Sequence, residues 1–451
     1  MAGMVVKNNM SAINTLNTLN KNHSALSKSL QKVSSGMRIN SAADDASGYA
    51  ISERMRVQIR SLDQDNRNTQ NGNSMMKVAE GAVSSTVEIL KTLKEKVINA
   101  ANDTNTDSDR QQIQKELDQS IDQINDNANV TYNGKYLVDG SHNRRVNDGS
   151  TTGDVKTHLT NESLDATTKW GSSISSLKNR NGESLNIQST DMVTISVVNE
   201  GKTFTTSFQA SATLTQAFTE KLNNAVRGTE KFGNDDRGLT TMTEGATIGT
   251  GASGTAVTTA DLGSALTLQA KKGGVEFQIS GLTISITDAN GNINKSANAV
   301  LDNFTESIRA QNHSEDNAIV LQTGTKANQA IKIGLTDMRA QALGLQGKDG
   351  ATLNVSTQKN ANAAINVLDN AIQKALDQQT TIGAIESRLE YTSTNLTTAS
   401  ENVTASESTI RDADMAKEMT EYTKNNVLLQ AAQSMLAQAN QNSSSVLSLL
   451  Q

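Results

Sequence analysis

The chain has 451 residues, a formal net charge of −6, and neither proline nor cysteine. Average usage near 5% would give about 22 prolines, and proline interrupts helix interiors because it lacks an amide N–H and its ring clashes with the preceding turn. The lack of cysteine excludes disulfides, thiol nucleophiles, iron–sulfur clusters and cysteine zinc sites. The small negative charge gives no reason to expect a nucleic-acid partner.

Composition divides the chain into three zones. Residues 1–129 and 355–451 contain few glycines and place apolar residues at spacings of three and four, which is typical of helices. Residues from about 141 to 316 are rich in Ser, Thr, Gly and Asn and contain short alternating runs, which favour strands. The sequence therefore predicts an α+β fold, in which long coiled-coil-like helices at the two ends pair and a β-rich region is inserted between them.

The first helical zone contains a seam whose steps alternate between three and four residues, as in a coiled coil. The members of this seam are Leu16, Leu19, His23, Leu26, Leu30, Val33 and Met37. We interpret His23 as a neutral histidine that packs or snorkels at this seam, because no other candidate metal ligand accompanies it. A seam in the C-terminal zone begins with Ile365, Leu368, Ile372 and Ala375 and continues with unbroken spacing from Ile382 to Ile410, which predicts one helix of about 45 residues or more.

The C-terminal segment from Asn425 to Gln451 has no charged side chain, although it is rich in Asn, Gln and Ser. A membrane span would not tolerate so many amides, and a solvated helix face would carry charge. We therefore expect burial by several uncharged neighbours, with both ends poorly ordered in the monomer and folding on assembly. The predicted assembly residues here are Leu428, Leu429, Met435, Leu436, Val446, Leu447 and Leu450.

The middle zone is expected to hold strands, turns and two helices. The turn 199–202 predicts a hairpin between its flanking runs, and Asp288 to Gly291 is a second turn signal. The expected strands are 192–198, 203–209, 275–280 and 282–287, and the expected helices are 214–226 and 297–310.

Candidate chemical motifs are weak. Gly249 to Gly254 matches G-x-G-x-x-G, but it lies in a Thr/Gly/Ala-rich stretch, so we interpret it as an exposed loop. Asp44 and Asp45 are interpreted as a cap, a turn or a salt bridge to Arg38, because adjacent helix residues point about 100° apart. We expect no catalytic residue, no cofactor and no metal. No run of 18 apolar residues occurs, so no membrane insertion is expected.

Four motifs follow one another along the chain: Ser34 to Arg56, Tyr132 to Gly140, Ile331 to Gly344, and Ser434 to Gln441. In this order they resemble motifs of the bacterial flagellins, the filament subunits of the flagellum. The resemblance covers about residues 2–140 and 318–451, and none is claimed for the middle.

The resemblance implies a structural subunit that self-assembles into the helical flagellar filament for motility, and not an enzyme. It implies an inner terminal domain from 1–43 and 405–451, and a helical rod with a β-hairpin from 44–140 and 318–404. Residues 141–317 would form one or more variable β-rich outer domains. A hook–filament junction protein, or an outer domain that is adhesive or carries glycans, remains an alternative.

The resemblance also implies partners and a location. The main partner would be the chain itself, and the others an export chaperone, the type III export apparatus, the filament cap and the hook-junction proteins. The filament would be extracellular, exported without a cleaved signal peptide, and the N-terminus lacks a basic region followed by an apolar core.

Flagellins can also be recognised by an innate immune receptor through a patch on the second core helix. Carried over by alignment, this patch falls on Thr92, Lys96 and Glu116. Recognised members of the family have arginine where Thr92 stands and leucine where Lys96 stands. The loss of a bidentate donor and the charge in an apolar contact both predict weak recognition.

Overall fold

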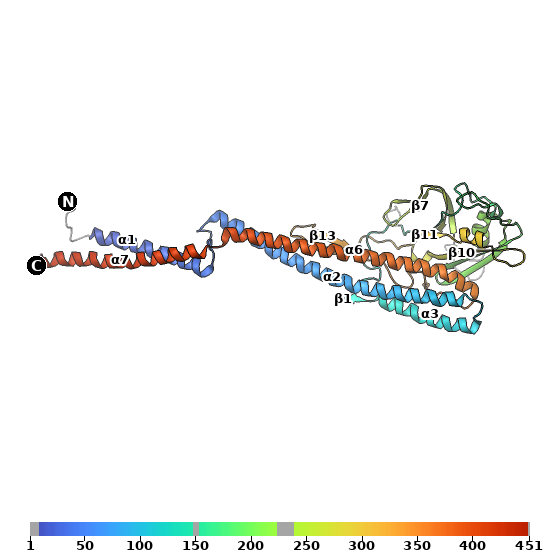
Figure 1. Ribbon diagram of the computed structural model, residues 1–451, viewed down its shortest axis with the longest axis horizontal. Coiled ribbons are helices and arrows are strands. Elements are labelled where there is room, and N and C mark those ends of the chain that lie inside the picture. The colour runs from blue at the N-terminus through green and yellow to red at the C-terminus, as the bar shows by residue number, and fades with distance from the viewer. Residues whose placement is uncertain (1–8, 148–152, 223–238, 450–451) are drawn as a thin grey trace. The chain divides into compact units, whose positions relative to one another are not determined.

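In the computed structural model the described residues are 9–147, 153–222 and 239–449. They form two compact units. The first contains the residues up to Thr69, Gln322–Gln329 and those from Tyr391 onward; the second contains Gln70–Leu321 and Ala330–Glu390. Two long helices, α2 (Ala46–Ala100) and α6 (Gln358–Arg411), contribute residues to both units. Figure 1 shows the elements along the chain.

The first unit is built on two terminal helices, α1 (Met10–Ser35) and α7 (Met415–Leu449), which lie side by side (Figure 1). The Asn9 side chain caps the start of α1 by accepting the N–H of Ala12 at 3.0 Å. Gly36 ends this helix with a φ of 70°, a left-handed conformation that glycine adopts without a Cβ penalty.

The second unit has a helical core made by α2, α3 (Asp107–Ala128) and α6. The prediction of one long helix before residue 410 is confirmed, because α6 is a continuous helix of 54 residues. Fully buried residues of this core lie on all three helices and include Met76, Leu117 and Leu368. Val198 of the insertion joins the same cluster, so the insertion packs directly on the helical core.

Short strand pairs border the helical core. The strands β1 (Thr131–Tyr132) and β2 (Lys135–Tyr136) form a hairpin. Its turn residues Asn133 and Gly134 both have positive φ, as two-residue hairpin turns require. The strands β12 (Ile319–Gln322) and β13 (Ala330–Ile333) form another two-stranded sheet.

The insertion contains two larger antiparallel sheets and a hairpin. The predicted hairpin around residues 199–202 is confirmed, and its strands belong to a three-stranded sheet in the order β10-β4-β5. A second sheet has the order β11-β3-β9-β6. The bounds are β3 (His158–Asn161), β4 (Met192–Asn199), β5 (Lys202–Gln209), β6 (Leu239–Gly245), β7 (Thr247–Thr250), β8 (Ala256–Thr258), β9 (Ala265–Ala270), β10 (Ile279–Thr287) and β11 (Thr305–Ile308).

Helical turns complete the insertion and enclose a core of its own. These are α5 (Lys295–Leu301), a π-helix over Gln216–Leu222, and 3₁₀ turns at Ile174–Ser176 and Val275–Phe277. In this core Trp170 packs edge-on against Phe218, with ring centroids 5.6 Å apart. Such aromatic geometry adds to the stabilisation from area burial.

Several local predictions in the insertion are wrong. The expected helix 297–310 ends with α5, and its second half is strand β11, which pairs with the distant β3. The stretch from Gly249 to Gly254, predicted as an exposed loop, begins with the last two residues of β7, and its other four residues lie in the loop that joins β7 to β8, as predicted. A 3₁₀ turn occupies the start of the expected strand 275–280. Within the expected helix 214–226, Gln216–Leu222 form a π-helix, and residues 223–226 lie outside the described residues.

The helices in the described ranges lack the combination of length and apolar character that a bilayer span needs. The helical ends and the β-rich insertion together confirm the predicted α+β class.

Candidate functional site

The terminal helices α1 and α7 run antiparallel. Near one end of the pair, the Nδ2 of Asn9 donates a 3.2 Å hydrogen bond to the carbonyl of Ala439. Toward the other end, Lys32 of α1 lies 3.4 Å from Glu418 of α7, measured from Nζ to Oε1. Residue numbers therefore rise along one helix as they fall along the other, and these two contacts set the register.

Amide side chains bridge the middle of the pair. Asn22 donates from Nδ2 to the carbonyl of Leu428 at 3.2 Å, and Asn425 donates to the hydroxyl of Ser29 at 3.0 Å. Ser29 is buried, so this contact lies inside the interface. The uncharged amides of the C-terminal segment are thus contact groups between helices.

One face of each helix packs within the chain. From the predicted assembly residues, this face includes Leu19, Leu26 and Val33 of α1 and Leu429 and Leu436 of α7, all partly buried. Alanines at 432 and 439 are buried on the same side of α7. The spacing of three and four along α7 is that of a coiled-coil seam.

The remaining predicted residues lie on other faces. Leu16, His23 and Leu30 of α1 and Leu428 and Met435 of α7 are exposed, and the structure does not bring them into the α1–α7 interface. Val446, Leu447 and Leu450 have side chains outside the described residues. The predicted seam therefore mixes residues of the internal pair with residues that the single chain leaves uncovered.

The exposed apolar residues of the two helices form a larger group, which we call the exposed apolar set. Its α7 members occupy several sides of the helix. Val427 is two positions from the inward-facing Leu429, which places it about 160° round the helix, and Met435 is about 100° from Leu436. The set comprises Met10, Ile13, Leu16 and Leu30 of α1, and Met415, Met419, Val427, Leu428 and Met435 of α7.

Two linkers lead into this pair: the first, residues 36–45, joins α1 to α2, and the second, residues 412–414, joins α6 to α7. Main-chain hydrogen bonds join the two linkers. Arg38 N–H donates to the carbonyl of Arg411 at 2.7 Å, and Ala413 N–H donates to the carbonyl of Gly36 at 3.0 Å. Met37 and Asp412 form an antiparallel bridge between them. This contact fixes the point where α1 ends and α7 begins.

The adjacent carboxylates of the first linker shape its turn, which confirms the cap-and-turn interpretation. Asp44 accepts the N–H groups of Asn40 and Ser41 at 3.2 and 3.0 Å. The hydrogen bond from Ser41 is the main reason that the pKa of Asp44 is below its ordinary value. Asp45 accepts the N–H groups of Ser47 and Gly48 and so caps the start of α2.

The residues that the resemblance assigns to a receptor patch lie on α2 and α3. The Nζ of Lys96 is 3.0 Å from Oε1 of Glu116, and both side chains are about half exposed. Thr92, one turn before Lys96, is exposed and donates its hydroxyl to the carbonyl of Glu88 at 3.0 Å. The structure brings Lys96 and Glu116 together, and the sequence had not indicated this ion pair.

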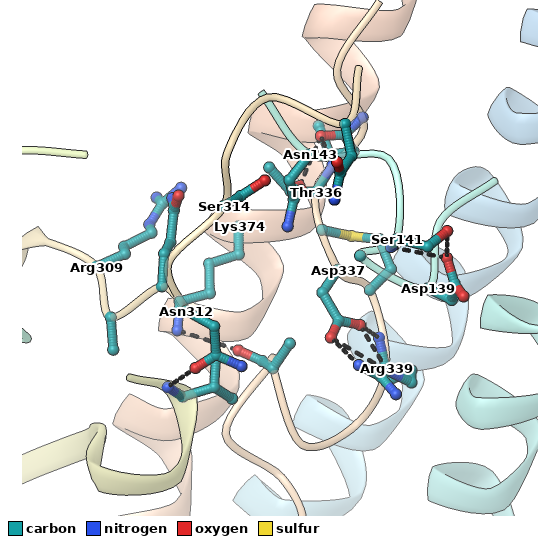
Figure 2. A pocket seen from close by; sticks show the side chains of 18 of the residues that line it. Asp139, Ser141, Asn143, Arg309, Asn312, Ser314, Thr336, Asp337, Arg339 and Lys374 are labelled. Atoms are coloured by element: carbon teal, nitrogen blue, oxygen red, sulfur yellow. Dashed lines mark hydrogen bonds and ion pairs between the residues drawn. The ribbon is translucent and has the colours of Figure 1, made fainter. Parts of the chain in front are cut away.

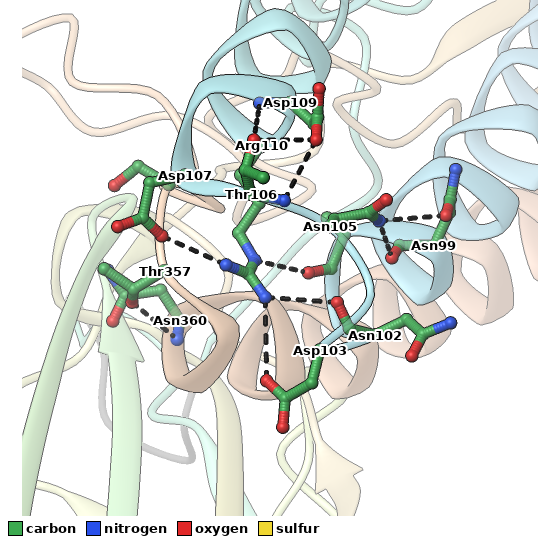
Figure 3. Close-up of polar contacts among 12 residues, drawn as sticks. Asn99, Asn102, Asp103, Asn105, Thr106, Asp107, Asp109, Arg110, Thr357 and Asn360 are labelled. Carbon is green, nitrogen blue, oxygen red and sulfur yellow. Dashed lines mark hydrogen bonds and ion pairs between the residues drawn. The ribbon is translucent and has the colours of Figure 1, made fainter.

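A buried arginine holds the turn between α2 and α3, the two helices that carry these patch residues. Arg110 donates from Nε to the carbonyl of Ala100 at 2.9 Å and from Nη2 to the carbonyl of Asn102 at 3.1 Å (Figure 3). Its Nη1 lies 3.0 Å from Asp107. The guanidinium thereby supplies a donor to the carbonyl of Ala100, the last residue of α2, which helix geometry leaves without an intrahelical partner.

The start of α3 is fixed by a capping box (Figure 3). Thr106 Oγ1 accepts the N–H of Asp109 at 3.3 Å, and the Asp109 carboxylate accepts the N–H of Thr106 at 2.9 Å. The T-x-x-D spacing was a readable signal, whereas the role of Arg110 depends on contacts with residues up to ten positions away.

A pocket of about 480 Å³ lies in the second unit, between the insertion and the helical core (Figure 2). Two of its arginines are paired with carboxylates of the lining: Arg339 forms an ion pair with Asp337, and Arg309 lies 2.6 Å from Asp377. Lys374 is buried and donates to Gln278 Oε1 at 3.1 Å. Among the described residues, no group of His, Cys, Asp and Glu has a geometry suited to a metal ion.

Comparisons with known proteins agree with the helical ends. The family described as the bacterial flagellin N-terminal helical region matches residues 6–143, and the bacterial flagellin C-terminal helical region matches residues 365–450. A flagellin of Clostridium tyrobutyricum is 34% identical over 443 residues, which are 97% of this chain and 99% of the relative. A flagellin of Bacillus subtilis strain 168 is 30% identical over 467 residues, covering 99% of this chain and 100% of the relative.

Among solved structures, FliC from Burkholderia pseudomallei is similar over 70% of this chain and 99% of that chain. The two sequences are 20% identical and the TM-score is 0.24.

Proposed function

The chain belongs to the bacterial flagellin family, and from this premise we propose how its terminal helices build a filament. Flagellins are structural proteins and not enzymes, and this chain is a subunit of the flagellar filament. The proposal concerns which surfaces join the copies and when the ends become ordered.

We assign the contacts between copies to the exposed apolar set of α1 and α7. The observation that carries this assignment is the distribution of the α7 members round the helix, from Val427 on one side to Met435 on another. A single partner helix covers one stripe only. Covering the whole set therefore takes several neighbours, and copies of the same chain in a helical polymer supply them.

The ends fold fully as they assemble. Within the described part of α1, Ser29 is the buried residue, and the leucines of its internal seam are covered only in part. A helix of this length draws most of its stability from the packing of its apolar face. The α1–α7 pair therefore gains most of its burial when neighbouring copies pack against it.

The three-part division expected from the resemblance remains part of this proposal. Residues 1–43 and 405–451 would form the inner domain, residues 44–140 and 318–404 the rod, and residues 141–317 the outer region. We also propose an export chaperone and the type III apparatus as partners during secretion, and the cap and hook-junction proteins as partners in the flagellum. Export would need no cleaved signal peptide.

The assignment is tested by polymerisation of purified protein, induced by salt or seeds and followed by electron microscopy. Truncation after Lys424 removes most of α7 and should leave a monomer. Met435→Lys tests the exposed apolar set directly. It places a charge on this surface and leaves unchanged the α7 residues that pack against α1, such as Leu429 and Leu436.

Gln433→Lys is the matched control, since Gln433 is exposed on the same helix but is polar. We expect Met435→Lys to keep the helix content of the parent, measured by circular dichroism, and to lose filaments, whereas Gln433→Lys polymerises more readily than Met435→Lys. Normal filaments from the truncated chain, or from Met435→Lys, would contradict the assignment.

A further inference from the structure

The sulfur atoms of this chain are distributed unevenly over its surface. The chain has no cysteine, so its 13 methionines hold all of its sulfur. Among the residues whose side chains are described, five methionines are exposed, and four of them belong to α1 and α7. The exposed ones are Met10, Met192, Met415, Met419 and Met435, with 60%, 37%, 43%, 46% and 62% of their surface accessible.

The remaining described methionines are more protected. Met75, Met76 and Met338 are buried in the helical core, with at most 6% exposure. Met37 and Met55 are partly buried, and the Met37 sulfur accepts a 3.2 Å hydrogen bond from Nε of Arg411. Among the methionines whose side chains are described, the four most accessible thioethers thus lie within the exposed apolar set that the proposed function assigns to assembly.

Exposed methionine is the readily oxidised form of this side chain. A peroxide transfers one oxygen atom to the thioether, which gives a sulfoxide and, from hydrogen peroxide, one molecule of water. The thioether sulfur is oxidised by two electrons, and the O–O bond of the peroxide is broken and reduced. The product is polar, so its burial against apolar neighbours is unfavourable unless a hydrogen-bond donor meets it.

We propose that Met10, Met415, Met419 and Met435 are oxidation sites that control assembly, an inference that rests on the proposed function. In the free chain these thioethers react with peroxide, and the sulfoxides prevent the helices from packing against other copies. In the filament the same residues are covered and become resistant. Oxidation and assembly therefore exclude each other, and the modification is reversible because methionine sulfoxide reductases restore the thioether.

The first experiment treats the full-length monomer with hydrogen peroxide, removes the oxidant, and measures seeded polymerisation by light scattering. Peptide mass spectrometry reports the oxidation of each methionine. We expect sulfoxide at the four sites and at Met192, and a fall of about tenfold or more in polymer formed. Treatment with the two reductases that act on the two sulfoxide epimers should restore assembly.

The second experiment applies the same peroxide dose to assembled filaments. Met192 lies in β4, outside the assembly helices, and serves as the internal standard for peroxide access. We expect Met192 to be oxidised to the same extent as in the monomer, while the four sites are oxidised several-fold less than in the monomer.

A variant with all four sites changed to leucine removes the reactive sulfur and keeps apolar side chains of similar volume. Its polymerisation after peroxide is compared with that of the same variant untreated, and Met192→Leu is the matched control. We expect the ratio of polymer formed after peroxide to polymer formed without it to approach one for the four-site variant and to remain low for Met192→Leu.

Two results would overturn the inference: monomer with sulfoxide at the four sites that polymerises like untreated protein, or equal oxidation of the four sites in filaments and in monomer. Both differ from a failure of the proposed function. That failure would appear without any peroxide, as normal filaments from Met435→Lys.

Discussion

Arg411, at the last position of α6, donates from Nη1 to Oε1 of Glu53 on α2 at 2.7 Å. The guanidinium is buried, lies 5.7 Å from the centre of the Tyr49 ring, and reaches the sulfur of Met37. One side chain thus contacts α2 and the linker after α1 at the point where the two linkers are hydrogen-bonded.

Arg411→Ala is expected to destabilise the first unit by about 1–3 kcal/mol, because it removes a buried side chain together with its charged hydrogen bond. Hydrogen exchange should show the loss first in α1 and at the start of α7. Arg56→Ala is the control, since Arg56 also pairs with Glu53 at 3.0 Å but is over one third exposed. Such surface pairs contribute about 0–1 kcal/mol, so equal effects of both variants would argue against the role of Arg411.

The same pair predicts a pH dependence. The hydrogen bond from Arg411 is the main cause that lowers the pKa of Glu53. A lowered pKa means that the unfolded chain binds the proton more tightly, so the contribution is present above the ordinary glutamate pKa and is lost as the pH falls through the lowered value. Glu53→Gln should reduce this part of the acid sensitivity, measured by unfolding between pH 3 and 6.

Arg110 provides a third prediction, in the α2–α3 turn. Arg110→Met keeps most of the buried chain length but removes the side-chain donor to the carbonyl of the buried Ala100, whereas the carbonyl of the exposed Asn102 still accepts the N–H of Asn105 at 3.3 Å. An unpaired buried carbonyl costs about 1–3 kcal/mol, and we expect a loss of this size in thermal unfolding. Asp107→Asn is the control, because Asp107 is 82% exposed and its pair with Arg110 is partly solvated. A larger loss for Asp107→Asn would contradict this account.

Asp302, which follows α5, is a buried carboxyl whose replacement by a neutral side chain should stabilise the folded chain. Burial raises the pKa of this carboxyl to about 6, against hydrogen bonds from the Ile284 N–H and the Asn366 side chain that lower it. The folded chain therefore binds the proton more tightly than the unfolded chain, and stability falls as the pH rises from about 4 to about 6.

Asp302→Asn keeps an acceptor oxygen for Ile284 and removes the buried charge. We expect this variant to be more stable than the parent above pH 6, by about 1–3 kcal/mol, and to lose the advantage below pH 4. Asp288→Asn is the comparison, because Asp288 has a pKa lowered by hydrogen bonds from Asn292 and should show no gain. Chemical denaturation at pH 4 and pH 7 measures both. No gain at pH 7 for Asp302→Asn would contradict the prediction.

Local sequence patterns correctly predicted the long helix α6 and the β4–β5 hairpin, because these elements depend on periodicity and turn residues within one segment. They failed at Thr305–Ile308, where pairing with β3, more than 140 positions earlier, decides the conformation. They also failed to separate Leu19 from Leu16. Both fit a seam of alternating threes and fours, and only the position of α7 shows which is covered.

The receptor patch gives the last prediction, which extends the expectation of weak recognition. Recognised members of the family have arginine at the position of Thr92 and leucine at the position of Lys96, and this chain retains only Glu116. In the structure Lys96 neutralises Glu116 through the 3.0 Å ion pair, so the retained carboxylate is occupied as well. We expect this protein to activate the receptor poorly in a cell reporter assay.

Restoring the family residues should raise that response. Thr92→Arg supplies a bidentate donor, and Lys96→Leu both frees Glu116 and returns an apolar contact, so the double variant should respond more strongly than either single change. Lys91→Leu is the control, because Lys91 lies on the same helix and its ion pair with Glu88, at 2.8 Å, is exposed. Strong signalling by the parent protein at ordinary potency, or an equal gain from Lys91→Leu, would show that these positions do not set recognition.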